Sequence, residues 1–318
     1  MKRSVIKQGF STFVISLPSR WVKKHGIKKG DELEITEGAN SLLISTHPQP
    51  KRHPISVDVS ELDRTSLVLL IRSLYRVGYE EINLSFSKES TFHFRTSKKE
   101  SVIAVIHEEI NRLVGMETVQ QKKGVSKILS LTKLESTEFD IILRRIFLLI
   151  LDLLEDFEQA YISNNKPLLQ TIEDKHNTIS KFVSCCVRIL ALTGGKDARS
   201  CILYSILTLL DKLVDEVKGA ARMALRFDVS SKKSKKLLQL THNSFNLYYG
   251  LFYKYDEEVV VKISSLKEEL SRELVAQSKG IGHGELIVAV HLLSIAEIIR
   301  GLVELRISLQ YYSDSPNI

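Results

Sequence analysis

The first thirty residues of this 318-residue chain contain eight lysine and arginine side chains and no acidic one. Over residues 1–53, ten basic residues stand against four acidic ones, a net charge of +6. The remainder of the chain carries only +1 of the formal net charge of +7. Clustered cations neutralise phosphates and release counterions, so this asymmetry favours a polyanionic partner. We expect this end to bind nucleic acid; the alternative is a solvated basic face that only keeps the chain soluble.

The elements that must position these cations are short strands and one short helix within residues 1–46. An alternating apolar run over 13–17 ends at Pro18, and an amphipathic turn follows over 19–25, with Ser19 placed to cap it. A lysine–glycine–aspartate turn then leads into further short strands between residues 33 and 44. So short a segment buries little apolar area by itself, so we expect it to form a dimer.

This N-terminal pattern resembles the AbrB, MazE and SpoVT swapped-hairpin family. The matching features are Gly9–Pro18, Trp21 and Ile27–Leu33: a glycine turn, an apolar strand ending in Leu-Pro, and a Lys-Gly-Asp turn. The resemblance implies an intertwined homodimer whose hairpins place basic side chains on double-stranded DNA. Val14 stands where the family often has an arginine, so contacts to phosphate are expected before contacts to bases.

The residues expected to contact DNA follow from position against that pattern. The first choices are Lys7, Arg20 and Lys23, and behind them stand Lys2, Arg3, Ser11 and Lys24.

A proline-containing basic stretch, 47–54, predicts a linker, and residues 55–133 then alternate between strands and helices. The expected strands are 55–59, 81–86, 91–96 and 126–132, and the expected helices are 62–77 and 98–114. The order βαββαβ indicates a ferredoxin-like module. It has no cysteine and no phosphate-binding loop, so pairing or ligand sensing is the expected role.

From residue 136 to 312 apolar residues recur at three- and four-residue steps, which predicts a helical domain. The expected helices are 137–163, 166–192, 197–226, 231–253, 256–278 and 284–312. They divide into three plus three, because joints at Gly195 and Gly280 each precede a third helix. An acidic residue, Asp211 or Glu297, follows each joint at a similar distance. The fold class is therefore multidomain α+β.

The helical region resembles the PhoU family of phosphate-uptake regulators, in which two three-helix bundles lie side by side. The matching motif is Leu210–Asp215, where carboxylates four residues apart share one helix face. The resemblance implies a divalent or iron ion near Glu173, Asp174, Asp211 and Asp215. A solvated acidic face is the alternative.

The other acidic pairs of that family pattern are incomplete in this chain. Asn177 stands four residues after Glu173, and Gly301 stands four residues after Glu297. On the fifth helix Ser264 occupies the first acidic position, with Glu268 four residues later. A multinuclear metal cluster is therefore not expected.

Several functional classes are disfavoured by the composition. The longest apolar candidate, 141–154, is interrupted by charges, and the start of the chain is not a signal peptide, so we expect a cytoplasmic protein without membrane insertion. Cys185, Cys186 and Cys201 have no zinc spacing and are expected to be buried thiols. No catalytic triad or Walker loop is present, so a nuclease or phosphatase is a distant alternative and we expect no enzyme.

The combined expectation is a cytoplasmic transcriptional regulator of phosphate uptake, a homodimer or higher even oligomer. Its helical domain would sense transport state, through contact with the ATPase subunit of a phosphate transporter. The alternative is an interaction protein that controls a phosphate ABC transporter without binding DNA. An antitoxin role is disfavoured, because antitoxins of the resembled family carry a short toxin-binding tail instead of a large helical domain.

Overall fold

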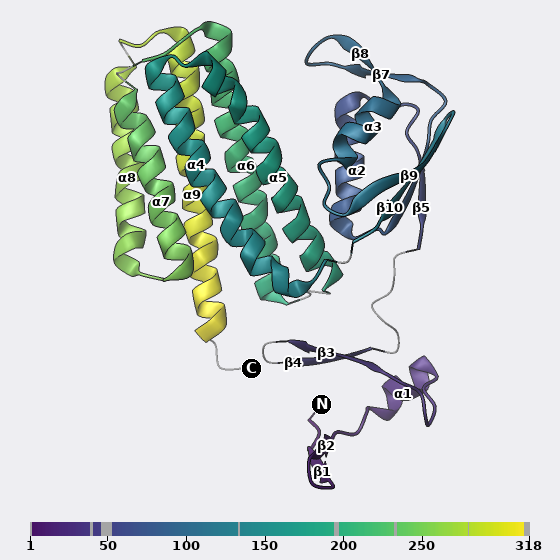
Figure 1. Ribbon diagram of the computed structural model, residues 1–318. Helices are drawn as coiled ribbons and strands as arrows, with labels where there is room; N and C mark the ends of the chain where they lie inside the picture. Colours follow the sequence, from purple (N-terminus) through teal and green to yellow (C-terminus); the bar gives the residue numbers. More distant parts are fainter. Residues whose placement is uncertain are drawn as a thin grey trace. The chain divides into compact units, whose positions relative to one another are not determined.

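The computed structural model describes residues 2–38, 41–45, 53–132, 134–193, 197–231, 234–278 and 280–314 (Figure 1). The chain divides into two compact units, Met1–Lys51 and Arg52–Ile318. The second unit contains an α/β module followed by a long helical region.

The N-terminal unit consists of two small hairpins and a short helix. β1 (Ile6–Gln8) and β2 (Thr12–Val14) pair antiparallel around Gly9, which has a φ of 76° that favours glycine. β3 (Glu34–Gly38) and β4 (Ser41–Ser45) form the second hairpin. Residues 39–40 of the second predicted turn, and residues 47–52 of the predicted linker, lie outside the described residues.

The helix α1 (Ser19–His25) lies between the two hairpins in the sequence. It ends at Gly26, whose left-handed backbone lets its N–H bond the carbonyl of Lys23. The prediction that Ser19 caps this helix is wrong: the N-cap position is Pro18, and no side chain caps the helix there. Ser19 is already the first helical residue.

The α/β module begins with a parallel strand pair, β5 (Ile55–Asp58) and β6 (Glu81–Ser85), joined by helix α2 (Arg64–Val77). A separate hairpin follows, β7 (Ser90–His93) with β8 (Lys98–Ser101), and then helix α3 (Val102–Ile110). The hairpin of β9 (Met116–Lys122) and β10 (Val125–Ser130) completes a four-stranded sheet ordered β5-β6-β10-β9.

The ferredoxin-like prediction is wrong in its topology. In a split βαβ arrangement another strand separates the two parallel strands, whereas β5 and β6 are direct neighbours here. The prediction missed β9, because its outer half is polar and exposed and shows no apolar alternation. It also assigned the polar strand β8 to a helix.

Helices α2 and α3 give the module its hydrophobic core. Leu67 and Ile71 of α2 and Ile106 of α3 are almost fully buried with Ile82 and Leu84 of the sheet. The helix α2 begins at Asp63, whose carboxylate accepts hydrogen bonds from the backbone N–H groups of the first turn.

The helical region contains the six predicted helices at nearly the predicted bounds. They are α4 (Phe139–Ser163), α5 (Lys166–Leu192), α6 (Ala198–Phe227), α7 (Lys235–Tyr253), α8 (Glu257–Gln277) and α9 (His283–Asp314), with a short 3-10 turn at Ser136–Glu138 before them. The first three helices pack in sequence, α7, α8 and α9 pack together, and α6 lies against α9 (Figure 1). One continuous hydrophobic core runs through both groups.

Local signals explain where these helices begin and end. The side chains of Asn165, Asp197 and Asp256 cap α5, α6 and α8. Asn164 and Asp228 end α4 and α6 in the left-handed conformation that short polar residues tolerate. The predicted joint at Gly194 and Gly195 lies outside the described residues.

Helix α9 is by length and composition able to cross a membrane, with a mean hydropathy of 2.1 over its most apolar window. It packs against α6, α7 and α8, and its residues Leu292, Ile295 and Ile299 are buried in the core. Of that apolar window 44% is buried, so packing in the bundle accounts for part of its apolar composition. This helix is a longer apolar candidate than the predicted 141–154.

The three cysteines differ in environment. Cys185 and Cys186 of α5 are buried, and burial raises the pKa of the Cys185 thiol to about 11. Cys201 of α6 is exposed, so the prediction of three buried thiols is wrong for this residue. It lies near the start of α6, before the helix enters the core.

Candidate nucleic-acid interface

The first hairpin has one face that carries a lysine and another that is apolar. Lys7 lies directly across from Phe13, and Ile6 lies across from Val14. Since successive side chains of a strand point to opposite faces, Lys7 shares one face with Phe13, and Ile6 shares the other with Val14.

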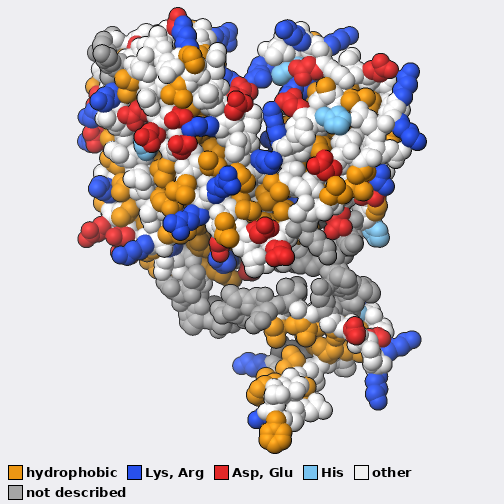
Figure 2. Space-filling view, viewed as in Figure 1, with side chains coloured by type: hydrophobic (Ala, Val, Ile, Leu, Met, Phe, Trp, Pro, Cys, Tyr) orange, Lys and Arg blue, Asp and Glu red, His pale blue; other side chains and the backbone are white. Residues whose placement is uncertain are grey.

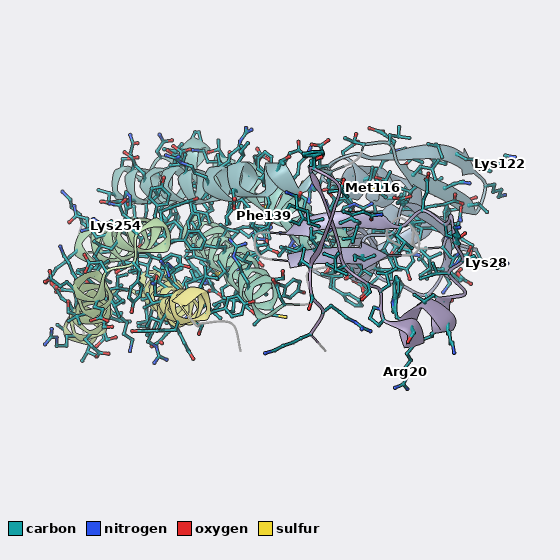
Figure 3. The ribbon with its side chains drawn as sticks, turned by 90° about the horizontal axis from the view of Figure 1, so that it is seen from below. Arg20, Lys28, Met116, Lys122, Phe139 and Lys254 are labelled. Carbon is teal, nitrogen blue, oxygen red and sulfur yellow. The ribbon has the colours of Figure 1, made fainter. Side chains whose placement is uncertain are left out.

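Helix α1 carries the second group of predicted contacts. Arg20, Lys23 and Lys24 are exposed, and their spacing of three and four residues places them on neighbouring parts of one helix surface. Figure 3 shows the Arg20 side chain extending away from the helix. Half-buried Trp21 and Val22 hold the opposite side.

The turn after α1 uses the acid that follows the basic run. The backbone N–H of Lys28 donates to Oδ2 of Asp31 at 2.7 Å, and the N–H of Asp31 donates to the Lys28 carbonyl at 3.1 Å. Gly30 supplies the positive φ, 94°, that this turn requires. The predicted Lys-Gly-Asp turn is confirmed, and the Asp31 carboxylate stabilises the turn itself.

The basic side chains of this unit are available to an external anion. Lys2, Arg3, Lys7, Arg20, Lys23 and Lys24 are all exposed, as is the hydroxyl-bearing Ser11. Within the described part of the chain, none of these six cations forms an ion pair. Their charge is therefore not neutralised by neighbouring carboxylates.

The same unit leaves large apolar side chains uncovered. Val5, Ile6, Phe13 and Ile35 are each about half exposed or more, and Phe10 at the turn is fully exposed. Between residues 2 and 45, no residue whose exposure the structure describes is buried. A single copy thus gives this unit no closed hydrophobic core.

The predicted metal carboxylates lie instead in a network of cations between α2, α5 and α6. Oδ2 of Asp211 accepts a hydrogen bond from Arg76 of α2 at 2.7 Å, and its Oδ1 accepts one from the Ser180 hydroxyl at 2.7 Å. Oδ1 of Asp215 accepts from Lys218 at 2.6 Å and lies 2.9 Å from Nε2 of His176.

The remaining two predicted ligands do not join that group. Glu173 binds Arg222 with both oxygens, the shorter contact being 2.6 Å, and lies 3.8 Å from Arg95. Asp174 is exposed on the outer side of α5. The bond to Arg222 lowers the pKa of Glu173.

The charge of Asp215 is fixed by its neighbours. Burial alone would raise the pKa of this carboxyl, but hydrogen bonds from His176 and Lys218 outweigh burial and hold the pKa well below its usual range. The Asp215 carboxylate is therefore ionised and already bound by cationic side chains.

These residues do not fit a metal ion. A cation would have to displace Arg76 from Asp211 and Lys218 from Asp215. In the ranges that the structure describes, no three His, Cys, Asp or Glu residues are grouped so as to hold one. The predicted metal site has no support in this geometry, and we derive no metal chemistry from it.

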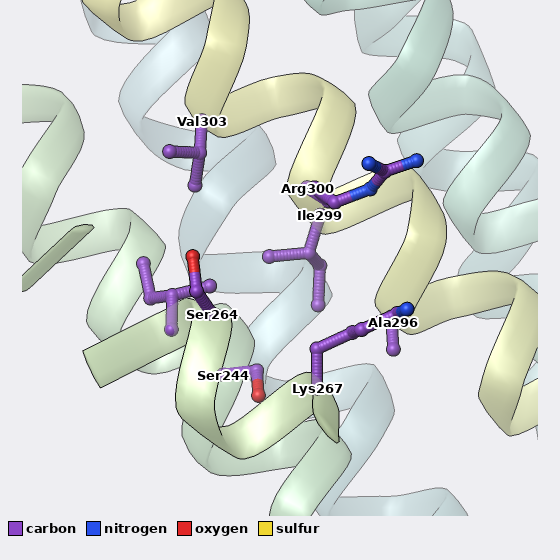
Figure 4. A pocket seen from close by; sticks show the side chains of 8 residues that line it. Ser244, Ser264, Lys267, Ala296, Ile299, Arg300 and Val303 are labelled. Carbon is purple, nitrogen blue, oxygen red and sulfur yellow. The ribbon is translucent and has the colours of Figure 1, made fainter. Parts of the chain in front are cut away.

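In the second group of helices, α7, α8 and α9, cationic side chains again bind the acid that was considered as a metal ligand. Figure 4 shows Lys267, Arg300, Ser244 and Ser264 around a small cavity of about 20 Å³ between α7, α8 and α9. Glu297 is bound by Lys267 and Arg300, each at 3.0 Å. The one acid of the predicted Glu297 pair is therefore bound by cationic side chains of the same chain.

Sequence reasoning missed the arginines that join the α/β module to the helical region. Arg76 of α2 also donates to the hydroxyl of Ser184 at 3.1 Å, and buried Arg188 of α5 donates to the carbonyl of Tyr75 at 2.7 Å. Arg72, one turn before Arg76, binds Glu109 of α3. The four-residue spacing of Arg72 and Arg76 was the signal available in the sequence.

Comparison with known proteins bears on the N-terminal unit. Residues 6–55 match the model of the MazE antitoxin family, which is described as antidote–toxin recognition MazE, bacterial antitoxin. The predicted resemblance of this segment to the MazE and AbrB type is thereby confirmed. No curated protein and no solved structure matches the chain. These comparisons do not confirm the resemblance of the helical region to PhoU.

Proposed function

We propose that this protein is a DNA-binding regulator that acts as a homodimer through its N-terminal unit. The observation that carries the proposal is the coexistence, in one family-matched segment, of uncompensated cations and an uncovered apolar face. Exposed apolar faces of this extent mark association surfaces, and exposed cation clusters attract phosphates.

The two faces of the first hairpin suggest how the dimer would be arranged. A second copy would cover the face with Ile6 and Val14, which leaves Lys7 facing outward. Lys7, Arg20 and Lys23 would bind phosphates of the duplex, with the flanking candidates adding further contacts. Because these contacts are electrostatic, affinity should fall steeply as salt concentration rises.

The role of the second unit follows from resemblance alone. We propose that the helical region senses the state of phosphate transport, in the cytoplasm, by contact with the ATPase subunit of a phosphate transporter. Binding of such a partner would change operator affinity only if it favours one arrangement of the chain over another. The proposed activity involves no catalysis.

The family match favours a second candidate, antitoxin-type regulation, because the matching model is described by toxin recognition. In that case the chain would bind and inhibit a toxin protein in addition to DNA. The other alternative, control of a phosphate transporter without DNA, would leave the basic unit to serve dimerisation or an acidic partner.

Fluorescence anisotropy on the protein's own promoter DNA across a salt series tests the proposal. Lys7→Ala and Arg20→Ala should each weaken binding and reduce the salt slope by about 0.9 for each phosphate that is no longer neutralised. Lys262→Ala, an exposed lysine on α8, is the matched control and should change neither quantity. If the protein is dimeric in solution and does not bind the DNA at low salt, the proposal is contradicted and control of a transporter without DNA is the favoured alternative.

A further inference from the structure

The hairpin of β7 and β8 in the α/β module presents an exposed aromatic pair. The rings of Phe92 and Phe94 meet edge to face with centroids 5.0 Å apart, and Phe94 is 71% exposed. Phe92 in β7 is 38% exposed and Phe94 in the following turn is mostly exposed, and apolar ring surface left in water is unfavourable. The position of the pair therefore indicates contact with another molecule.

The inner face of the same hairpin is fixed by buried polar contacts. Nδ1 of His93 lies 2.6 Å from Glu100, which also accepts a hydrogen bond from Arg64 of α2 at 3.0 Å. The hydroxyl of Thr91 donates to the carbonyl of Leu62 at 2.8 Å. These contacts hold the hairpin on α2 and determine which side chains point outward.

The outward face is positively charged. Lys99 lies directly across from Phe92, so the two side chains share a face. Lys98, at the turn, is exposed but lies across from His93, and Arg95, also at the turn, lies 3.8 Å from Glu173 and is about half exposed. Within the described ranges Lys98 and Lys99 form no ion pair, while Glu100 is neutralised on the inner side by Arg64. Figure 2 shows basic side chains, with acidic ones among them, at this edge of the module.

We infer that the β7–β8 hairpin binds single-stranded nucleic acid. Bases stack on exposed aromatic rings, and lysine and arginine beside those rings contact the phosphates between the bases. An acidic peptide would satisfy the cations but would leave the two rings without planar partners. The rings lie on a projecting turn, which an unpaired strand can follow because its bases are free to turn outward.

This site is distinct from the proposed duplex contacts of the N-terminal unit. The inference does not depend on that function, since Lys7 and Arg20 belong to the other unit. It adds a second nucleic-acid contact of different chemistry to the same chain.

The test measures anisotropy of a fluorescein-labelled oligothymidylate of about twelve nucleotides, a length within the range of known single-strand sites. The full-length protein with Phe92→Ala and Phe94→Ala should bind it about tenfold or more weakly than the unaltered protein. The pair Phe92→Tyr and Phe94→Tyr keeps both rings and should retain binding. Lys98→Ala with Lys99→Ala should weaken binding and lower the salt slope.

The neighbouring hairpin supplies a matched control. Lys122→Ala removes an exposed positive charge from the β9–β10 hairpin, where no aromatic pair is present among the described residues, and should leave oligonucleotide binding unchanged. Lys7→Ala and Arg20→Ala should weaken duplex binding and leave the oligonucleotide unaffected.

Three results would overturn the inference. They are no oligonucleotide binding at low salt, equal binding by the phenylalanine and alanine forms, and an alanine form that loses duplex binding as strongly as single-strand binding. If the alanine form instead converts a larger oligomer into a smaller one in size-exclusion chromatography without changing oligonucleotide binding, the hairpin is a self-association surface. Absence of duplex binding alone in the unaltered protein would contradict only the proposed function.

Discussion

The N-terminal unit and the helical region differ in how far they bury their apolar side chains. In the helical region, aromatic residues such as Phe147 and Phe245 pack against each other in a continuous core, and carboxylates are bound by cations of the same chain. In the N-terminal unit, apolar faces and cations are both left exposed. The helical region thus has a closed core of its own, whereas one copy of the N-terminal unit has no buried residue among those whose exposure is described. Function is therefore expected where the chain leaves its own groups unsatisfied.

The largest effect should come from matched changes in the two regions. Phe147 is fully buried and packs against five other aromatic rings, so Phe147→Ala should lower the free energy of unfolding by about 3–5 kcal/mol. Phe13→Ala removes a ring that is 67% exposed and lies on the Lys7 face, outside the proposed dimer contact, so it should change that free energy by less than about 0.5 kcal/mol. Urea denaturation followed by circular dichroism measures both; similar decreases would contradict the contrast.

The next largest effect should come from a new negative charge, which should weaken the dimer when placed in the N-terminal unit and not when placed in the helical region. Ile6→Asp should raise the dimer dissociation constant roughly thirtyfold, about 2 kcal/mol, because a second copy would have to bury the carboxylate. Ile141→Asp makes the same change on α4, at a residue that is also exposed, and should leave the dimer intact. Analytical ultracentrifugation decides, and a dimer that tolerates Ile6→Asp would place the interface elsewhere.

The pair of Arg76 and Asp211 tests how far the second unit depends on its internal charges. Both side chains are mostly buried, so a double-mutant cycle with Arg76→Ala and Asp211→Ala should give a coupling of about 1–1.5 kcal/mol. The pair of Lys88 and Glu61, whose side chains are 55% and 81% exposed, should give about 0.5 kcal/mol or less. Equal couplings would mean that the contact between α2 and α6 contributes no more than a surface pair.

The smallest expected effect is a dependence on pH. The folded pKa of Asp215 lies below its unfolded value near 3.8, so its contribution to stability is present above that pH and is lost as the pH falls below it. Asp215→Asn should therefore reduce the acid sensitivity of unfolding by less than about 1 kcal/mol, since the side chain is partly exposed. Asp174→Asn on the exposed surface of α5 serves as the control, and its free energy of unfolding should depend on pH as in the unaltered protein.

The helices could be predicted because their signals are local. Apolar residues spaced for one helix face, and capping residues such as Asn165 and Asp197, are sufficient to determine where α5 and α6 begin. Strand order could not be predicted from local signals, because β6 pairs with β5 and β10 through contacts between segments that are distant in the sequence. The polar strand β9 is held by pairing with β10, and its own sequence has too little alternation to reveal it.

The sequence by itself determined the basic N-terminal segment, its Lys-Gly-Asp turn and its resemblance to the MazE type, because charge density and turn chemistry are local properties. It also determined that Asp211 and Asp215 share a helix face. Only the tertiary structure decided what those carboxylates bind, since Arg76 lies 135 residues before Asp211 in the chain. Only folding likewise decided that Phe92 and Phe94 face outward, because Glu100, which contacts His93 within the hairpin, binds Arg64 of α2 and so fixes the hairpin. A carboxylate or an aromatic ring has no fixed role until the fold supplies its neighbours.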